Sequence, residues 1–170
     1  SFLEETFPTA LICGVTSGGE IKKGRMTPPS VLVRISIFTC TRIRMHAFMV
    51  RPGEEREKGS HIASLIDATP SCQAAELLID SWNLSVSDLL SSINTCSQKV
   101  KLFGCAPYRD PNLKANYVFT TKLNEECNAI VLTYSGEDFH LVTDYVTGWK
   151  PLGNQMQATR ASGKILYELD

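Results

Sequence analysis

The stretch VLVRISIFTCTRIRMHAFMVR occupies residues 31–51 and alternates apolar with polar side chains. Odd positions carry mostly aliphatic residues, whereas the even positions include Arg34, Ser36, Arg42, Arg44 and His46. A period of two residues is typical of a β-strand with one buried and one solvent-facing side. Because 21 extended residues would span roughly 70 Å, more than an ordinary strand, we predict a bend or bulge near Thr39–Thr41 that divides the stretch into two strands.

The segment after this strand region carries signals for a loop and then for a helix. Residues 54–59 are mostly charged and end in glycine, so we predict a solvated loop there. Thr69 before Pro70 is a typical helix N-terminus, because threonine caps free N–H groups and proline fits the first turn. An apolar stripe at helical spacing follows, formed by Cys72, Ala75, Ile79 and Trp82. We therefore predict a helix over residues 70–82.

A second short helix is predicted over residues 85–93. Ser85 and Asp88 have the spacing of a capping box. The inner face of this helix would carry Val86, Leu89, Leu90 and Ile93. Both helices are amphipathic, so each must bury its apolar side against another layer, and a sheet is the available partner.

Strand signals return in the C-terminal part of the chain. Turn sequences rich in Asp, Asn, Gly and Glu separate four apolar runs, namely Lys99–Phe103, Asn116–Leu123, Cys127–Tyr134 and Phe139–Val146. Their short spacings predict an antiparallel meander. We expect residues 148–163 to form a loop-like tail and residues 164–169 to form a last edge strand.

The order of two strands, a helical pair and a meander predicts an α+β fold. We expect a curved antiparallel β-sheet with the helices packed on one face. A length of 170 residues fits a single domain, with residues 1–8 as an N-terminal arm. Layers of this kind often enclose a pocket between sheet and helices.

Basic residues are concentrated in one part of the chain. Seven of them, and no acidic residue, lie between Glu20 and Glu54, although the whole chain has a net charge of −1. Four share even positions and would project from one strand face: Arg34, Arg42, Arg44 and His46. Guanidinium groups on a rigid element suit the binding of carboxylate, sulfate or phosphate. The alternative is a solvated outer face, or cross-strand pairs with acidic residues.

The chemistry of this face restricts the class of partner. We expect an acidic small molecule, or the acidic surface of a protein or polysaccharide. Nucleic acid is a poor match, because aromatic residues are not interleaved with the basic ones, no known RNA- or DNA-binding motif is present, and the pI is about 6.3. No run of apolar residues is long enough for a transmembrane helix.

An enzymatic site is the competing hypothesis. His140 and Asp144 lie four residues apart on a predicted strand and would share a face, and Cys105 could supply a nucleophile for a small hydrolase. The alternative is that the histidine and aspartate are ordinary surface residues and that the cysteine is inert. No nucleophile elbow, zinc-protease or phosphate-loop motif is present, and the sequence indicates no metal and no cofactor.

The cysteines leave the compartment open. Six cysteines occur singly, without a C-x-x-C pair, which argues against a zinc finger. An even number is compatible with three disulfides, and buried free thiols are the alternative. One glycosylation sequon, Asn83-Leu84-Ser85, favours a glycoprotein. Together these features favour an extracellular location, with a cytoplasmic one as the alternative.

The leading functional hypothesis is a non-enzymatic binding protein of extracellular type. Its basic strand face would meet an anionic ligand or partner. Two alternatives are a small hydrolase with its site between sheet and helices, and an interaction domain of a larger protein, which the Ser-Phe-Leu start of the chain suggests.

Overall fold

The computed structural model describes residues 2–27, 30–82, 84–107, 117–121, 126–144, 148–162 and 165–170. Within these ranges the helices are α1 (Phe2–Thr6), α2 (Glu55–Asp67) and α3 (Val86–Ile93). The strands are β1 (Cys13–Val15), β2 (Glu20–Lys22), β3 (Arg25–Thr27), β4 (Arg42–Phe48), β5 (Cys72–Ile79), β6 (Lys101–Cys105), β7 (Val118–Thr120), β8 (Ala129–Ser135), β9 (Ala158–Ser162) and β10 (Ile165–Leu169). This is an α+β fold, as the sequence predicts.

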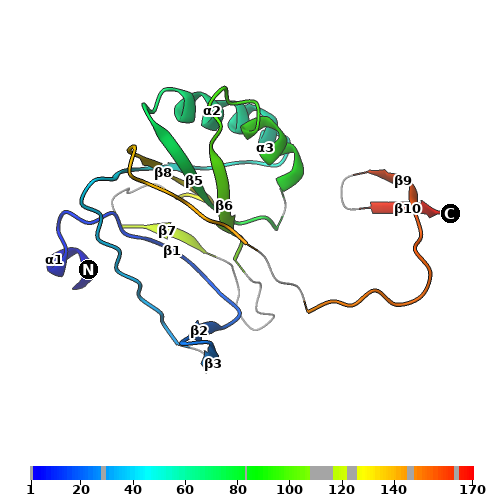
Figure 1. Ribbon diagram of the computed structural model, residues 1–170, viewed down its shortest axis with the longest axis horizontal. Coiled ribbons are helices and arrows are strands. Elements are labelled where there is room, and N and C mark those ends of the chain that lie inside the picture. Colours follow the sequence, from blue (N-terminus) through cyan, green and yellow to red (C-terminus); the bar gives the residue numbers. More distant parts are fainter. Residues whose placement is uncertain are drawn as a thin grey trace.

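A mixed four-stranded sheet in the order β4-β8-β5-β6 forms the middle layer of the molecule (Figure 1). β8 pairs antiparallel with both β4 and β5, whereas β5 and β6 run parallel. β5 and β8 are the two central strands, and most of their residues are buried. Strands that are covered on both faces supply the core directly, because each of their side chains points into a packed layer.

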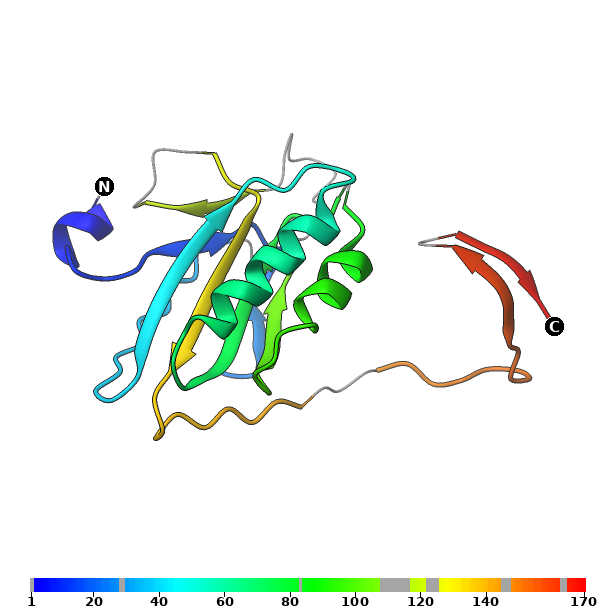
Figure 2. The same ribbon diagram turned by 90° about the horizontal axis from the view of Figure 1, so that it is seen from above.

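Helices α2 and α3 cover one face of this sheet, as predicted for the helical layer (Figure 2). The largest cluster of buried residues lies between the two layers and includes Ile62, Ile66, Ala75, Leu77, Leu89, Ile93 and Val131. Each fully buried aliphatic side chain of this kind stabilises the fold by about 1.5–3 kcal/mol relative to an exposed one. We call this side of the sheet the helix face.

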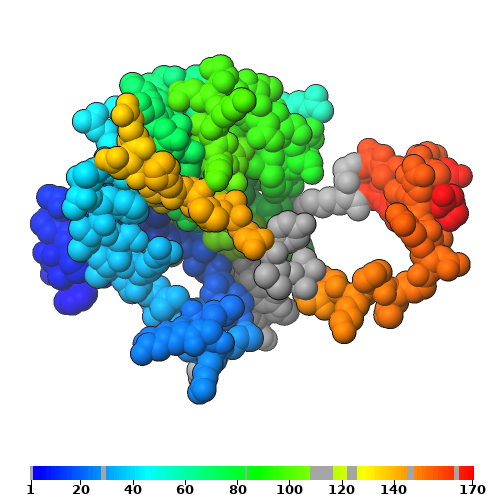
Figure 3. Space-filling view, in the orientation of Figure 1, coloured from blue at the N-terminus to red at the C-terminus, as the bar shows by residue number. Residues whose placement is uncertain are grey.

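A two-stranded ribbon of β1 and β7 lies against the opposite face of the sheet (Figure 1). Val118 of β7 packs on Leu78, Ile130 and Leu132, which point away from the helices. The two remaining ribbons, β2–β3 and β9–β10, are antiparallel hairpins. All residues of β9 and β10 are exposed, and Figure 3 shows this hairpin standing clear of the body.

The contact between α2 and α3 depends on a glycine and on acid groups. A Cβ atom at Gly59 would lie 2.6 Å from the carbonyl oxygen of Leu89, so the helices approach closely only because no side chain is present. Glu55 accepts a hydrogen bond from the backbone N–H of Ser85 at 3.0 Å. Arg56 pairs with Asp88 at 2.8 Å. These contacts hold the N-terminal ends of the two helices side by side.

The predicted helix over residues 70–82 is wrong, because residues 72–79 form the central strand β5. Six of its eight residues are buried, so its apolar positions do not alternate. Because apolar residues occupy nearly every position of this strand, some of them, such as Cys72, Ala75 and Ile79, also fall at the spacing of a helical stripe. The second predicted helix is confirmed as α3, and the Ser85 hydroxyl accepts the N–H of Asp88 at 3.4 Å, as expected for its cap.

The predicted loop over residues 54–59 is also wrong, because residues 55–59 form the first turns of α2. Of the charged residues that suggested a loop, Arg56 and Glu57 are exposed and Glu55 is buried, and Gly59 faces α3. The strand region 31–51 is confirmed only in part. Residues 42–48 form β4, a bend occupies residues 39–40, and residues 31–38 pair with no strand.

The predicted antiparallel meander is wrong in its connections. Strands are confirmed near Lys99–Phe103 and Cys127–Tyr134, but the first runs parallel to β5, so the sheet is mixed. Residues 139–144 are irregular, and β7 pairs with β1. The predicted tail over residues 148–163 contains β9, which pairs with the predicted last strand. The remaining parts of Asn116–Leu123 and Phe139–Val146, and sequon residue Asn83, lie outside the described residues.

We expect Gly59→Ala to reduce the free energy of unfolding by about 1–3 kcal/mol in urea denaturation. Alanine favours a helix over glycine by about 1 kcal/mol, so the sign of the change reports the clash with Leu89. Ser60→Ala, at an exposed neighbour in the same helix, is the control and should change stability by less than about 0.5 kcal/mol. A stabilised Gly59→Ala protein would contradict the close helix contact.

Acid should weaken the attachment of α2 to its neighbours. Backbone hydrogen bonds from Ser85 lower the pKa of Glu55, and backbone and side-chain hydrogen bonds from Ser97 lower the pKa of Asp67. A carboxyl whose folded pKa is lowered stabilises the fold above its unfolded pKa of about 4, and this contribution is lost as the pH falls through the lowered value. Thermal unfolding from pH 6 to pH 2 should therefore show a decline below about pH 5 that is shallower in the Glu55→Gln/Asp67→Asn variant.

Candidate functional site

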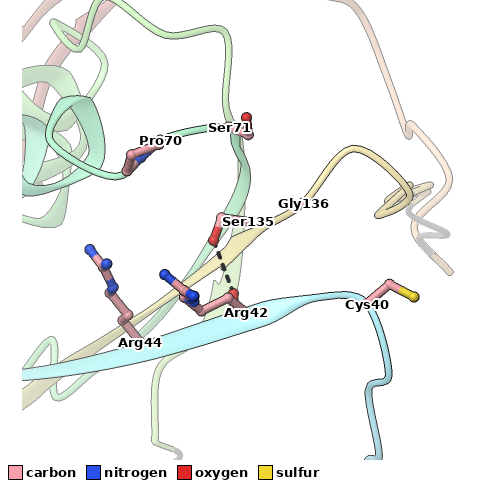
Figure 4. Close-up of a pocket in the computed structure, with 7 residues that line it drawn as sticks. All are labelled: Cys40, Arg42, Arg44, Pro70, Ser71, Ser135 and Gly136. Atoms are coloured by element: carbon pink, nitrogen blue, oxygen red, sulfur yellow. Dashed lines mark hydrogen bonds between the residues drawn. The ribbon is translucent and has the colours of Figure 1, made fainter.

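A cleft of about 280 Å³ opens on the helix face, at the end of the sheet where α2 stops. Its lining consists of Cys40, Arg42, Arg44, Pro70, Ser71, Ser135 and Gly136. Figure 4 shows that both arginine side chains rise from β4 toward the segment of Pro70 and Ser71. Three separate parts of the chain therefore meet at this cleft.

The register of β4 against β8 places the arginines. Arg42 pairs with Ser135, and Arg44 pairs with Thr133. Paired residues in an antiparallel ladder project from the same face of a sheet. The hydroxyl of Ser135 donates to the carbonyl oxygen of Arg42 at 3.2 Å, which ties the floor of the cleft to β4 (Figure 4).

The wall of the cleft has a fixed backbone shape. Ser71 has a φ of +53°, which is in the left-handed region that non-glycine residues rarely adopt. The N–H of Gly136 donates to the Ser71 carbonyl oxygen at 3.1 Å, and a Cβ atom at Gly136 would lie 2.9 Å from the carbonyl oxygen of Cys40. Strained backbone that neighbouring contacts hold in place is common at ligand sites.

The cleft carries positive charge without a countercharge. Within the described residues, neither Arg42 nor Arg44 forms an ion pair with a carboxylate. Their Cα atoms are about 7 Å apart, the distance between alternate residues of a strand, so the two charges repel each other. Thr133, opposite Arg44, is fully buried, and its hydroxyl has no hydrogen-bond partner among the described residues. An anion between the guanidinium groups would relieve the repulsion and accept their hydrogen bonds.

The structure divides the four residues of the predicted basic face. Arg42 and Arg44 lie together in the cleft, and His46 follows them on the same face of β4. Burial, Arg44 and His61 lower the pKa of His46, which favours its neutral form. Arg34 is separate, because its segment is irregular and its charge acts on Tyr134, whose side chain points to the opposite face.

The predicted catalytic residues are not assembled into a site by strand geometry. His140 and Asp144 are exposed and lie in an irregular segment, so a spacing of four residues does not place them on one face. Burial, followed by the charge of Glu76, raises the pKa of Cys105. A raised pKa leaves less thiolate at neutral pH, and the thiolate is the nucleophile.

The cysteines form no disulfide bond. All six cysteines are free thiols, so the disulfide prediction is wrong. The alternative of buried free thiols holds in full only for Cys72, because the other five are half-buried or exposed. Cys40 belongs to the cleft lining, but its sulfur points away from the guanidinium groups in Figure 4.

No helix in the described ranges has the length and apolar character needed to cross a membrane. Across the same residues, no cluster of three or more potential metal ligands occurs.

The comparison with protein families covers the whole chain. The family model of the FIST N domain matches residues 1–170. This chain belongs to the FIST N domain family. FIST N domains are sensory and signalling domains. No curated protein and no solved structure is significantly similar to this FIST N domain.

No pattern in the sequence predicts the part of the cleft that lies outside the two arginines. Ser71 and Gly136 reach the site through backbone conformation, and Ser135 reaches it through the strand register. The only available signals were the Pro70-Ser71 and Ser135-Gly136 dipeptides, which are typical of turns. Neither dipeptide indicates by itself that it faces an arginine.

We expect Arg44→Gln to raise the pKa of His46, because the charge of Arg44 is one of the causes that lower it. Titration of the histidine ring signals by NMR measures this pKa directly. Arg34→Gln removes the same charge from the other side of the sheet and is the control. An equal rise of the His46 pKa in both variants would contradict the placement of Arg44 beside the imidazole.

Proposed function

We propose that this FIST N domain is a ligand-binding sensory module that captures a small anion between Arg42 and Arg44. The ligand class is a carboxylate, phosphate or sulfate group on a small molecule. The single observation that carries the proposal is a cleft of about 280 Å³ with two arginines that lack an ion pair within the described residues.

The chemistry of the lining supports an anion in particular. Two guanidinium groups offer planar pairs of N–H donors, which match the oxygen atoms of carboxylate and phosphate. The hydroxyl of Ser135 adds a neutral polar atom at the floor of the cleft, whereas the Ser71 hydroxyl points away from the arginines in Figure 4. None of the described residues that line the cleft is acidic, so no carboxylate among them competes with the ligand for the arginines.

The size of the cleft supports a small molecule over an extended polymer. A cavity of about 280 Å³ is just below the usual range of ligand pockets, which begins at about 300 Å³. Its lining comes from β4, from the segment after α2 and from the end of β8, so a bound molecule would contact three parts of the chain. The proposal is also consistent with the sensory character of the FIST N domain family.

Isothermal titration calorimetry with inorganic phosphate and with succinate measures the anion affinity and tests the proposal. Arg42→Gln/Arg44→Gln should weaken the binding of both anions by at least about tenfold, because each charge-assisted hydrogen bond contributes about 1.5–3 kcal/mol. Binding to the unmodified protein should also weaken as the salt concentration rises, because the cleft is open to solvent.

The control variant is Arg34→Gln, which removes one of the predicted basic residues from outside the cleft. Its anion affinity should stay within about twofold of the unmodified protein. Similar losses in the Arg34 variant and the double variant would indicate unspecific attraction to a basic surface. The absence of measurable binding to either anion would exclude the proposed class of ligand.

A further inference from the structure

A second and larger cavity of about 380 Å³ lies between α3 and the edge of the sheet formed by β5 and β6. It shares no lining residue with the arginine cleft. Among the described residues, its lining includes no charged side chain and is mostly aliphatic, with Ile62, Leu77, Ile79, Leu90, Ile93 and Val131 as the main side chains. The cavity is open to solvent on one side, so a ligand that covers its apolar lining would be favoured by removing that surface from water.

Gly104, in the lining of this cavity, lets β6 approach the backbone of β5 closely. It pairs with Leu77 in the parallel ladder of β5 and β6, and a Cβ atom there would overlap the Leu77 carbonyl oxygen. Its φ of +148° is also a conformation that other residues rarely adopt. A glycine inside a strand often marks a place where another group approaches the backbone closely.

The helix side of the cavity is only partly covered. Val86 and Leu90 of α3, and Leu102 of β6, are half-buried, whereas Ile93 and Val131 behind them are buried. The half-buried side chains therefore form the mouth and the buried ones form the base. A ligand that entered would remove the remaining apolar surface of the mouth from water, which is the driving force for apolar binding.

We propose that this cavity is a binding site for a neutral, apolar small molecule, separate from the anion cleft. The absence of a charged residue in its lining disfavours an ionised ligand, because a charge there would lose hydration without gaining a partner. An engineered apolar cavity of about 150 Å³ in another protein holds benzene, so a space of about 380 Å³ has room for a molecule of roughly ten to fifteen non-hydrogen atoms. Asn94, at the exposed end of α3, is positioned for a single polar contact at the mouth.

Thermal unfolding with indole as the probe tests this site. Indole is a neutral bicyclic molecule of suitable size, and indole-3-carboxylate is its anionic counterpart. We expect saturating indole to raise the melting temperature by about 2–4 °C, because a ligand that binds only the folded state stabilises it. Indole-3-carboxylate should bind this cavity at least tenfold more weakly.

Cavity-filling variants locate the binding. Leu90→Trp and Leu102→Phe each place a larger side chain in the cavity and should abolish the indole shift. Ser91→Trp, at an exposed position on the same helix, adds an aromatic ring outside the cavity and should keep the shift. Two filling variants are used so that a folding defect in one leaves the other available.

The same measurement separates this site from the anion cleft. Arg42→Gln/Arg44→Gln should retain the full indole shift and lose only the binding of phosphate. The proposal is overturned if indole produces no shift in the unmodified protein. It is also overturned if the shift persists in both folded filling variants, or if it disappears in the double arginine variant.

Discussion

The register of β4 against β8 is the constraint on which the candidate site depends. Pairing Arg42 with Ser135 turns both arginines to the helix face, beside the segment that follows α2. A shift of one residue would turn them to the opposite face and would expose Ile43 and Met45 to the helical side. The packing of these apolar residues under the β1–β7 ribbon therefore fixes the position of the charges.

The position of α2 decides which part of the helix face stays open. The helix covers β4 near His46 and Phe48, where the ring of Phe48 lies 5.7 Å from that of His61. It ends at Asp67, before it reaches Arg42 and Arg44. Hydrogen bonds from Ser97 to Asp67 hold this end in place. The same helix thus buries one half of the β4 face and leaves the other half as a cleft.

The parts of the fold with local signals could be predicted from the sequence. Alternation identified β4, and the Ser85 cap identified the start of α3, because both signals depend on neighbouring residues. The central strand β5 was mistaken for a helix, because burial on both faces removes the alternation that marks a strand. Gly59 is typical of a loop when only its neighbours in the sequence are considered. In the structure, this helical position requires glycine because α3 approaches too closely for a side chain.

The candidate site was predictable to the same limited degree. Arg42 and Arg44 lie on a true strand, so their shared face followed from the period of two. Arg34 lies before the bend, where the chain has no strand partner to fix its direction. Ser71 and Gly136 contribute through backbone conformations that long-range contacts impose, and no local pattern encodes those contacts.

The most direct test of the central claim is a map of backbone amide shifts by NMR during a titration with inorganic phosphate. An anion between Arg42 and Arg44 should shift the amide signals of Ser71, Ser135 and Gly136 along one saturable binding curve. The signals around Lys22, Lys23 and Arg25 should stay unchanged. Shifts spread over that basic hairpin, with none at Ser71 and Gly136, would contradict the account.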